Sequence, residues 1–191
     1  EGNAVSVTTT LNGGYGSRTV VTGAGCLLNN EMDDFSVKPG VPHMYGAVGA
    51  EANSIAPNKR MLSSMTPTIV LNNNKPWRVV GTPGGTTIPT SVYQTLVDII
   101  DFKLSPREAV NAPKFHHQWL PDEIYVEDGF NQAVISALKK MGNKITVRGA
   151  IGRTEEIMLK PGKIIEAVDV HWGERDATGY HVFTHSVSLH T

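Results

Sequence analysis

The sequence predicts an α+β protein with antiparallel sheets, and three observations support this fold class. Runs rich in Val, Ile and Thr are bounded by turn residues, as strands are, and other runs have apolar residues at helical spacing. The strand runs and the helical runs are segregated, which favours antiparallel sheets. A chain of 191 residues, of which 40% are hydrophobic, is long enough to bury one sizeable core, so we expect a single globular unit.

The first part of the chain is predicted to contain one strand and long loops. Residues 3–11 (NAVSVTTTL) have the composition of a strand that begins almost at the first residue. Gly2 and Asn3 suit a turn before it, so we expect a preceding strand in a longer polypeptide. Residues 13–16 predict a loop, and the polar stretch 29–58, rich in Pro and Gly, is typical of a lid or a binding segment.

A β-hairpin is predicted around a run of three asparagines. Strands over 66–71 and 77–82 flank the turn 72–74. The Ser63–Ser64 pair precedes the hairpin and the Gly84–Gly85 pair follows it, so two hydroxyls and two backbone amides should meet at one sheet edge. These groups indicate a pocket for an anion and for a developing oxyanion.

Helices and further strands are expected in the second half. Residues 87–102 have apolar side chains at helical spacing and predict a core helix. Ser105 and Glu108, with a proline between them, predict a capping box that opens a short helix, which Pro113 ends. A helix over 131–141 is followed by a glycine. Strands are expected near 144–147, 156–160 and 164–170, the last two separated by a turn at Pro161 and Gly162.

Composition excludes several classes of partner. The formal net charge is -1 and the basic residues are scattered, which disfavours nucleic acid. No apolar run approaches the roughly 20 residues needed to span a membrane. The single cysteine, Cys26, excludes an internal disulfide, and its apolar neighbours predict a buried thiol.

Metal sites are not predicted. His116 and His117 are adjacent, so on a strand they point to opposite faces and cannot bind one ion together; we expect them to pack with Trp119. The acidic cluster at 31–34 lacks the ligand spacing of a calcium loop, and by itself it predicts a solvated loop. Four more histidines lie near the C-terminus, at His171, His181, His185 and His190. No cofactor is predicted.

Several long motifs occur in an order that resembles the small subunit of γ-glutamyltranspeptidases, members of the N-terminal nucleophile hydrolase group. They are VTTTLN, LLNNEMDDFSVKPGVP, NKRMLSSMTPT, GTPGG and FHHQWLPDE. The resemblance covers residues 1–180 as one domain and leaves 181–191 as an extension of unknown role. It implies a four-layer αββα sandwich, incomplete at the N-terminus.

The resemblance also implies roles for nine residues. Thr10 matches a threonine whose hydroxyl hydrogen-bonds the nucleophile, and Asn12 matches a residue whose side-chain amide binds the substrate. Because side chains alternate along a strand, Thr10 and Asn12 should face the same side of the sheet. Glu31 and Asp34 would hold the α-ammonium group of a γ-glutamyl donor, which suits carboxylates. Tyr45 matches the tyrosine of a lid over 39–50. The remaining four are Ser63 and Ser64, which would bind the α-carboxylate, and Gly84 and Gly85, which would form the oxyanion hole.

The nucleophile implied by the resemblance is a threonine at the start of the small subunit, about nine residues before Glu1 by the family's motif spacing. Its own α-amine would serve as base. We therefore expect the chain alone to be inactive. A large subunit of the same precursor would complete the enzyme and supply an arginine to the carboxylate clamp, and the whole would be periplasmic or extracellular.

Three readings follow. The first is cleavage of the γ-glutamyl amide of glutathione and related compounds, with transfer to water, amino acids or peptides. The second keeps the fold but acts on glutaryl amides or poly-γ-glutamate; a glutaryl donor has no ammonium group, so Glu31 and Asp34 discriminate between the two. The third is a non-catalytic fragment or binding partner.

Overall fold

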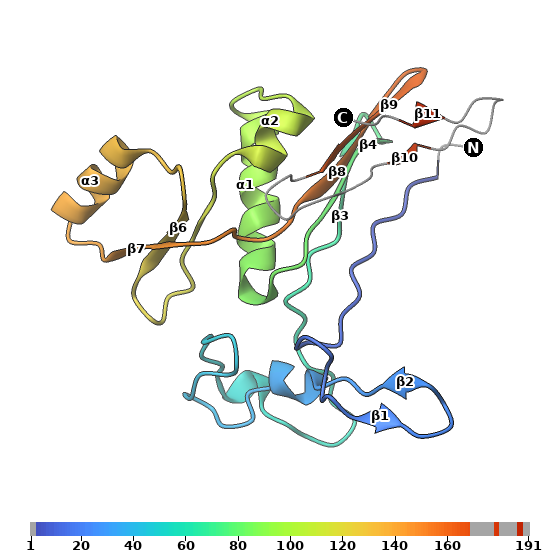
Figure 1. Ribbon diagram of the computed structural model, residues 1–191, viewed down its shortest axis with the longest axis vertical. Coiled ribbons are helices and arrows are strands. Elements are labelled where there is room, and N and C mark those ends of the chain that lie inside the picture. Colours follow the sequence, from blue (N-terminus) through green and yellow to red (C-terminus); the bar gives the residue numbers. More distant parts are fainter. Residues whose placement is uncertain (1–2, 169–177, 180–186, 189–191) are drawn as a thin grey trace.

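The computed structural model describes residues 3–168, 178–179 and 187–188 (Figure 1). Its strands are β1 (Val20–Val21), β2 (Cys26–Leu27), β3 (Thr68–Asn72), β4 (Lys75–Gly81), β5 (Phe115–His116), β6 (Ile124–Glu127), β7 (Ile145–Arg148), β8 (Glu155–Lys160), β9 (Lys163–Val168), β10 (Thr178–Gly179) and β11 (Val187–Ser188). Its helices are α1 (Ile88–Ile100), α2 (Pro106–Asn111) and α3 (Gln132–Lys140), with short 3-10 helices η1 (Glu31–Asp34), η2 (Glu51–Asn53) and η3 (Gly85–Thr87). Gly2, His171, His181, His185, His190 and most of the extension 181–191 lie outside the described residues.

The central sheet is antiparallel, with the strand order β3-β4-β8-β9. The predicted hairpin is confirmed: Asn72 pairs with Lys75, and φ is 49° at Asn73 and 63° at Asn74. Two successive positive φ angles are typical of the type I′ turn, which asparagine tolerates well. The predicted β8–β9 hairpin is also present, with Lys160 paired to Lys163.

Helices α1 and α2 cover one face of this sheet (Figure 1). The predicted capping box opens α2: the Glu108 amide donates to the Ser105 hydroxyl, and the Ser105 amide donates to the Glu108 carboxylate at 2.9 Å. Buried apolar residues on these elements are Val80, Ile88, Val92, Ile99, Ala109, Val110, Met158 and Ala167. None of the helices within the described ranges is long and apolar enough to cross a membrane.

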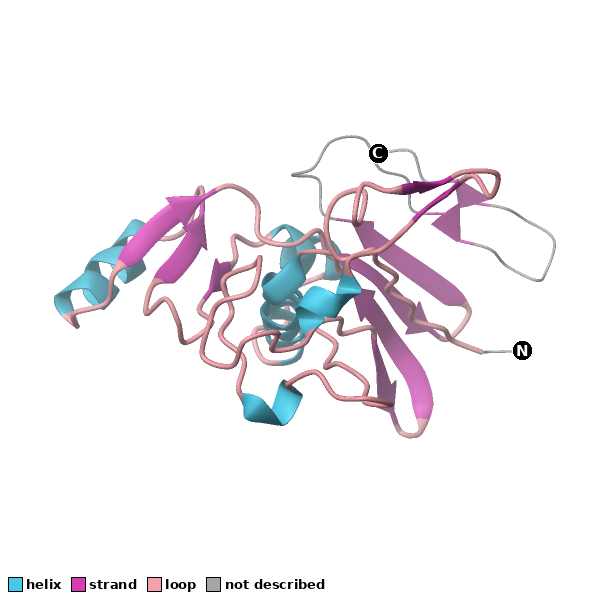
Figure 2. Cartoon of the chain, turned by 90° about the horizontal axis from the view of Figure 1, so that it is seen from below, coloured by secondary structure: helices cyan, strands magenta, loops and turns pink. Residues whose placement is uncertain are grey.

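The second sheet has the order β5-β6-β7, and Figure 2 shows α1 and α2 between the two sheets. β5 and β6 are antiparallel, but β6 and β7 are parallel, with Ile124 opposite Ile145. Parallel neighbours require a crossover, which α3 provides. The α+β class is thus present, but the expectation of purely antiparallel sheets is wrong for this sheet.

Residues 3–11 are extended but form no ladder with any described strand, which corrects the predicted first strand. Val5 and Val7 are 74% and 70% exposed. The Ser6 hydroxyl donates to the Val80 carbonyl at 3.2 Å, and Thr8 lies beside Gly81 on the face of the sheet away from the helices. The segment cannot pair with β4, because β3 and β8 already occupy both edges of that strand.

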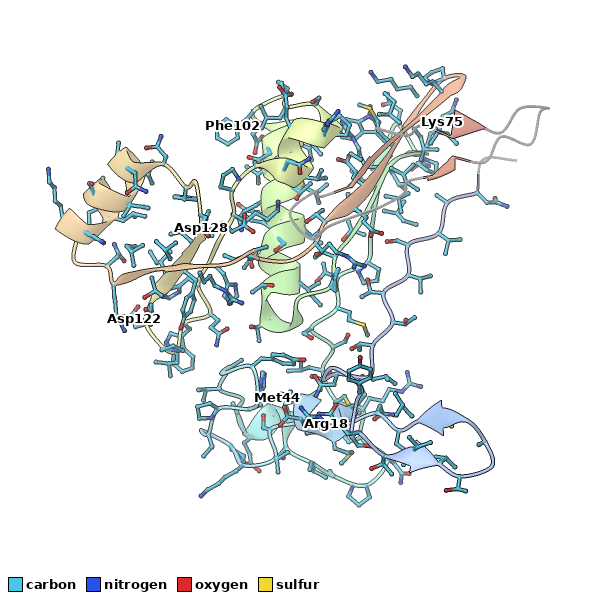
Figure 3. All side chains as sticks on the ribbon, viewed as in Figure 1. Arg18, Met44, Lys75, Phe102, Asp122 and Asp128 are labelled. Carbon is cyan, nitrogen blue, oxygen red and sulfur yellow. The ribbon has the colours of Figure 1, made fainter. Side chains whose placement is uncertain are left out.

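Residues 12–60 form an irregular lobe that contains β1, β2, η1 and η2, and Figure 3 labels Arg18 and Met44 within it. Cys26 is exposed in this lobe, contrary to the predicted buried thiol. Its strand neighbour Leu27 is half-buried instead, because adjacent strand residues face opposite sides.

Candidate active site

A cavity of about 470 Å³ lies between the irregular lobe, the chain before β3 and the start of α1, and we call it the hairpin cavity because the chain on either side of the β3–β4 hairpin lines it. Four predicted site residues line it: Asp34, Tyr45, Ser63 and Ser64. Thr86, which follows Gly85, lines it too. The chain on both sides of the hairpin therefore reaches this cavity, although neither Gly84 nor Gly85 lines it.

Glu31 and Asp34 begin and end η1, and their carboxyl groups hydrogen-bond each other. Burial raises the pKa of Glu31 above its ordinary value of 4.5, and the adjacent Asp34 raises it further. Burial also raises the pKa of Asp34, although the hydrogen bond from Glu31 partly offsets this. A hydrogen bond between two carboxyl groups needs one of them to be protonated. The Oε1 atom of Glu31 is buried with no hydrogen-bond partner in the described part of the chain, so it is open to a donor.

Tyr45 contacts two other predicted site residues, Asn12 and Gly85. Its hydroxyl donates to the Asn12 carbonyl at 2.6 Å. Its ring lies against Gly85, where an added Cβ would be 3.1 Å from the ring. Burial raises the pKa of Tyr45, and Asp34 raises it further, so the hydroxyl stays protonated and able to donate.

Thr10 and Asn12 meet, but not through strand alternation. Asn12 has a φ of 70°, and its amide donates to the Thr10 hydroxyl at 2.8 Å. This is a local turn in which the threonine hydroxyl replaces a backbone acceptor. The Asn12 side chain donates to the Asn30 carbonyl at 3.1 Å, which ties the turn to the start of η1.

Gly84 and Gly85 adopt a conformation that other residues resist, with φ of 146° and 58°. A Cβ at Gly84 would lie 2.4 Å from the Thr87 hydroxyl. The amide and hydroxyl of Thr87 both donate to the Gly84 carbonyl, at 3.1 and 2.8 Å, and so fix the peptide plane that carries the Gly85 amide. Neither glycine amide donates to any described residue, which leaves both available to an oxyanion.

Ser63 and Ser64 approach the hairpin cavity in extended chain before β3. Ser63 is exposed and its hydroxyl accepts from the Met65 amide at 3.2 Å, whereas Ser64 is half-buried. No arginine of the described residues lines this cavity. The two hydroxyls are neutral, so a bound carboxylate would need a further cation.

Gln118 is a site residue that sequence reasoning missed. Its Oε1 accepts from the Thr86 hydroxyl and contacts the His116 Nε2, each at 2.9 Å. Its Nε2 donates to the Tyr45 carbonyl at 3.3 Å. Gln118 thus joins Tyr45 to the segment after Gly85. The motif FHHQWLPDE contains this glutamine, but nothing local in that motif indicates a contact with a loop about 70 residues away.

The adjacent histidines face opposite sides, as predicted: His116 is 2% exposed and His117 is exposed. Burial lowers the pKa of His116. The expected packing with Trp119 is wrong, because that side chain is 68% exposed and only its amide contacts the His117 ring. Among the described residues, no group of three or more His, Cys, Asp or Glu is arranged to hold a metal ion.

Known proteins resemble this chain over most of its length. A profile of the family described as Gamma-glutamyltranspeptidase matches residues 1–180. The chain is 50% identical over 181 residues to the glutathione hydrolase proenzyme of Escherichia coli K12, a match that covers 94% of this chain and 31% of that protein. The chain thus spans about a third of the length of this curated relative.

Solved structures agree with the sequence matches. The γ-glutamyltranspeptidase T380A mutant of Helicobacter pylori superposes with a TM-score of 0.86 at 50% identity, covering 89% of this chain and 94% of that chain. The Pseudomonas nitroreducens γ-glutamyltranspeptidase complexed with L-DON superposes with a TM-score of 0.86 at 45% identity. The match covers 95% of this chain and 94% of that chain. Because the family profile spans nearly the whole chain, this protein belongs to the γ-glutamyltranspeptidase family.

Proposed function

We propose that this chain is the small, catalytic subunit of a γ-glutamyltransferase and glutathione hydrolase. One observation carries the proposal: Asp34, Tyr45, Ser63 and Ser64 line a single cavity, and Tyr45 lies between it and the Gly84 and Gly85 amides, which donate to none of the described residues. That arrangement offers carboxylates, hydroxyls and an oxyanion hole to the two ends of a γ-glutamyl group. The relative from Escherichia coli is named a proenzyme, and this chain spans about a third of it. Both facts support a precursor that also supplies a large subunit.

Glu31 and Asp34 bind the α-ammonium group of the donor, because an ammonium offers three donors and the acidic pair offers acceptors. Ser63 and Ser64 bind the α-carboxylate, and Asn12 and Tyr45 close the pocket beside them. No arginine of the described residues lines the cavity, so an arginine of the large subunit completes the carboxylate clamp.

The nucleophile is a threonine hydroxyl at the start of the mature subunit, upstream of Glu1. Its oxygen adds to the γ-carbonyl carbon while its proton passes to the threonine's own α-amine. The Gly84 and Gly85 amides stabilise the oxyanion, and Thr10 orients the nucleophile. The C–N bond then breaks, the leaving nitrogen takes the proton, and an ester remains. Water or another amine attacks this ester, and the threonine oxygen recovers a proton.

The rest of the precursor completes the fold as a four-layer αββα sandwich. The helix-free face of the central sheet supports this, because Ile69 and Ile157 on it are 40% and 38% exposed. Residues 1–180 form the small-subunit domain and 181–191 extend it. The assembled enzyme is periplasmic or extracellular.

The test compares two donors in the complete, processed enzyme. Glu31→Gln combined with Asp34→Asn removes both charges at nearly constant volume. We expect kcat/KM for γ-glutamyl-p-nitroanilide to fall by about 100-fold or more, because hydrogen bonds to charged groups contribute about 1.5–3 kcal/mol each. Glutaryl-p-nitroanilide has no ammonium group, so its slow turnover should not change. Glu51→Gln, an exposed acid on η2, is the matched control and should behave like wild type.

Undiminished γ-glutamyl turnover in the double variant would contradict the proposal. Together with rapid glutaryl turnover it would favour the related acylase. An inactive wild-type complete enzyme would favour the non-catalytic binding partner.

A further inference from the structure

A second cavity, of about 340 Å³, adjoins the hairpin cavity, and we call it the Arg148 cavity. The two cavities share Tyr45, Thr86 and Gln118, which therefore form the wall between them. Gly84 lines the Arg148 cavity as well. A carbonyl held by the Gly84 and Gly85 amides would sit at the junction, with the γ-glutamyl group on one side and the other substituent of the carbonyl towards Arg148.

The Arg148 cavity is cationic. Arg148 is exposed at the end of β7, and its guanidinium lies 5.7 Å from the centroid of the Tyr125 ring. Within the described residues this guanidinium makes no ion pair, and no Asp or Glu lines the cavity. Arg153 lines a smaller adjacent cavity but lies 3.7 Å from the Glu155 carboxylate. Arg148 is therefore the cation there without a carboxylate partner among the described residues.

We propose that the Arg148 cavity binds the free carboxylate of the amine half of the substrate, and that Arg148 is the residue that recognises it. The inference rests on the proposed function. It adds which amines the enzyme recognises on the nitrogen side of the scissile bond: amino acids and short peptides with an unblocked C-terminus. A planar guanidinium recognises a carboxylate through two parallel hydrogen bonds.

One site serves both the leaving amine and the acceptor amine. In the first half-reaction the C–N bond to the leaving peptide breaks and its nitrogen gains a proton. In transfer, the acceptor nitrogen forms a C–N bond at the same carbon and loses a proton, as the C–O bond to threonine breaks. The second step is the reverse of the first with a different amine, so both amines occupy the same side of the carbonyl. Water needs no carboxylate, so hydrolysis of the ester does not depend on Arg148.

The test uses paired substrates with and without the carboxylate, in the complete processed enzyme. With Arg148→Gln we expect the KM for glycylglycine as acceptor to rise about tenfold or more, since a charge-assisted hydrogen bond is lost. The KM for glycylglycinamide should stay within about twofold of wild type on the same grounds. With glutathione as donor kcat/KM should fall similarly, whereas hydrolysis of γ-glutamyl-p-nitroanilide should be unchanged. Arg107→Gln, an exposed arginine on α2, is the matched control.

Equal effects on glycylglycine and glycylglycinamide, or no effect on either, would overturn the inference. A wild-type enzyme without γ-glutamyl turnover would instead defeat the proposed function, and the two failures are distinguished by the hydrolysis of γ-glutamyl-p-nitroanilide.

Discussion

Glu31 and Asp34 lie within one 3-10 turn, which brings their carboxyl groups into hydrogen-bond contact. Asn53 holds this turn by donating to the Asp34 carbonyl at 2.8 Å. The pair binds a proton more readily than ordinary carboxyl groups, because burial raises both pKa values. A bound ammonium would supply the positive charge that favours the ionised form of both carboxyl groups.

The raised pKa values of Glu31 and Asp34 predict opposite pH dependences for binding and for stability. Affinity for L-glutamate should rise with pH through the raised pKa values, because the ammonium group binds the ionised pair. The unliganded enzyme should lose free energy of unfolding over the same range, because a carboxyl with a raised folded-state pKa stabilises most below its unfolded pKa. Calorimetry of the complete enzyme between about pH 4 and pH 7 measures the affinity and the protons released.

Glu31→Gln should abolish most of the proton release and flatten the affinity profile. Binding of L-glutamate that weakens as pH rises, or that takes up protons, would show that the pair does not bind the ammonium group.

Some site residues could be predicted from the sequence, whereas Gln118 and Arg148 could not. The nine site residues were predicted from the family motifs and, for Tyr45, from the lid loop; four of them line the hairpin cavity, and Tyr45 contacts Asn12 and Gly85. Gln118 and Arg148 were missed because their contacts come from distant segments: the chain just after β5 lies beside Tyr45, and β7 lies beside Gly84. No local pattern of residues encodes such contacts.

Elements whose signals are local were predicted well. The asparagine turn and the Ser105–Glu108 capping box depend on a few neighbouring residues, and both are present. The parallel pairing of β6 with β7 and the failure of residues 3–11 to join a sheet depend on which strand edges are vacant, which is a property of the whole fold.

The central sheet contains a buried ion pair between Arg78 on β4 and Glu156 on β8, whose side chains are 3% and 0% exposed. Burial raises the pKa of Glu156, while the hydrogen bond from Arg78 favours its ionised form. The Arg78 Nε and Glu156 Oε2 atoms have no hydrogen-bond partner among the described residues. A pair that is incompletely satisfied in this way costs desolvation on both sides.

Removal of one partner of this ion pair should destabilise the protein more than removal of both. Glu156→Ala should lower the free energy of unfolding by about 3–5 kcal/mol, because Arg78 is left buried and unpaired. Arg78→Met combined with Glu156→Leu should recover most of that loss. Urea denaturation of the complete enzyme and its variants measures both. A double variant less stable than the single one would mean that the ion pair itself contributes the stability.

At the scale of the whole molecule, the described chain supplies one helix-covered sheet, a smaller mixed sheet and an irregular lobe that carries Tyr45 (Figure 1). The fold class was predictable from the segregation of strand and helix patterns. The placement of the lobe against the hairpin end was not, because it depends on contacts of Tyr45 with the distant residues Gly85 and Gln118.

The central claim is that this chain belongs to an enzyme whose nucleophile is an N-terminal threonine serving the cavity between Ser63–Ser64 and Gly84–Gly85. Intact-mass and N-terminal analysis of the small subunit, taken from the complete precursor and quenched during turnover of a γ-glutamyl donor, tests it most directly. The account predicts a subunit that begins with a threonine upstream of Glu1 and carries one γ-glutamyl group on that threonine. A mature subunit with another first residue, or a γ-glutamyl group attached elsewhere, would contradict it.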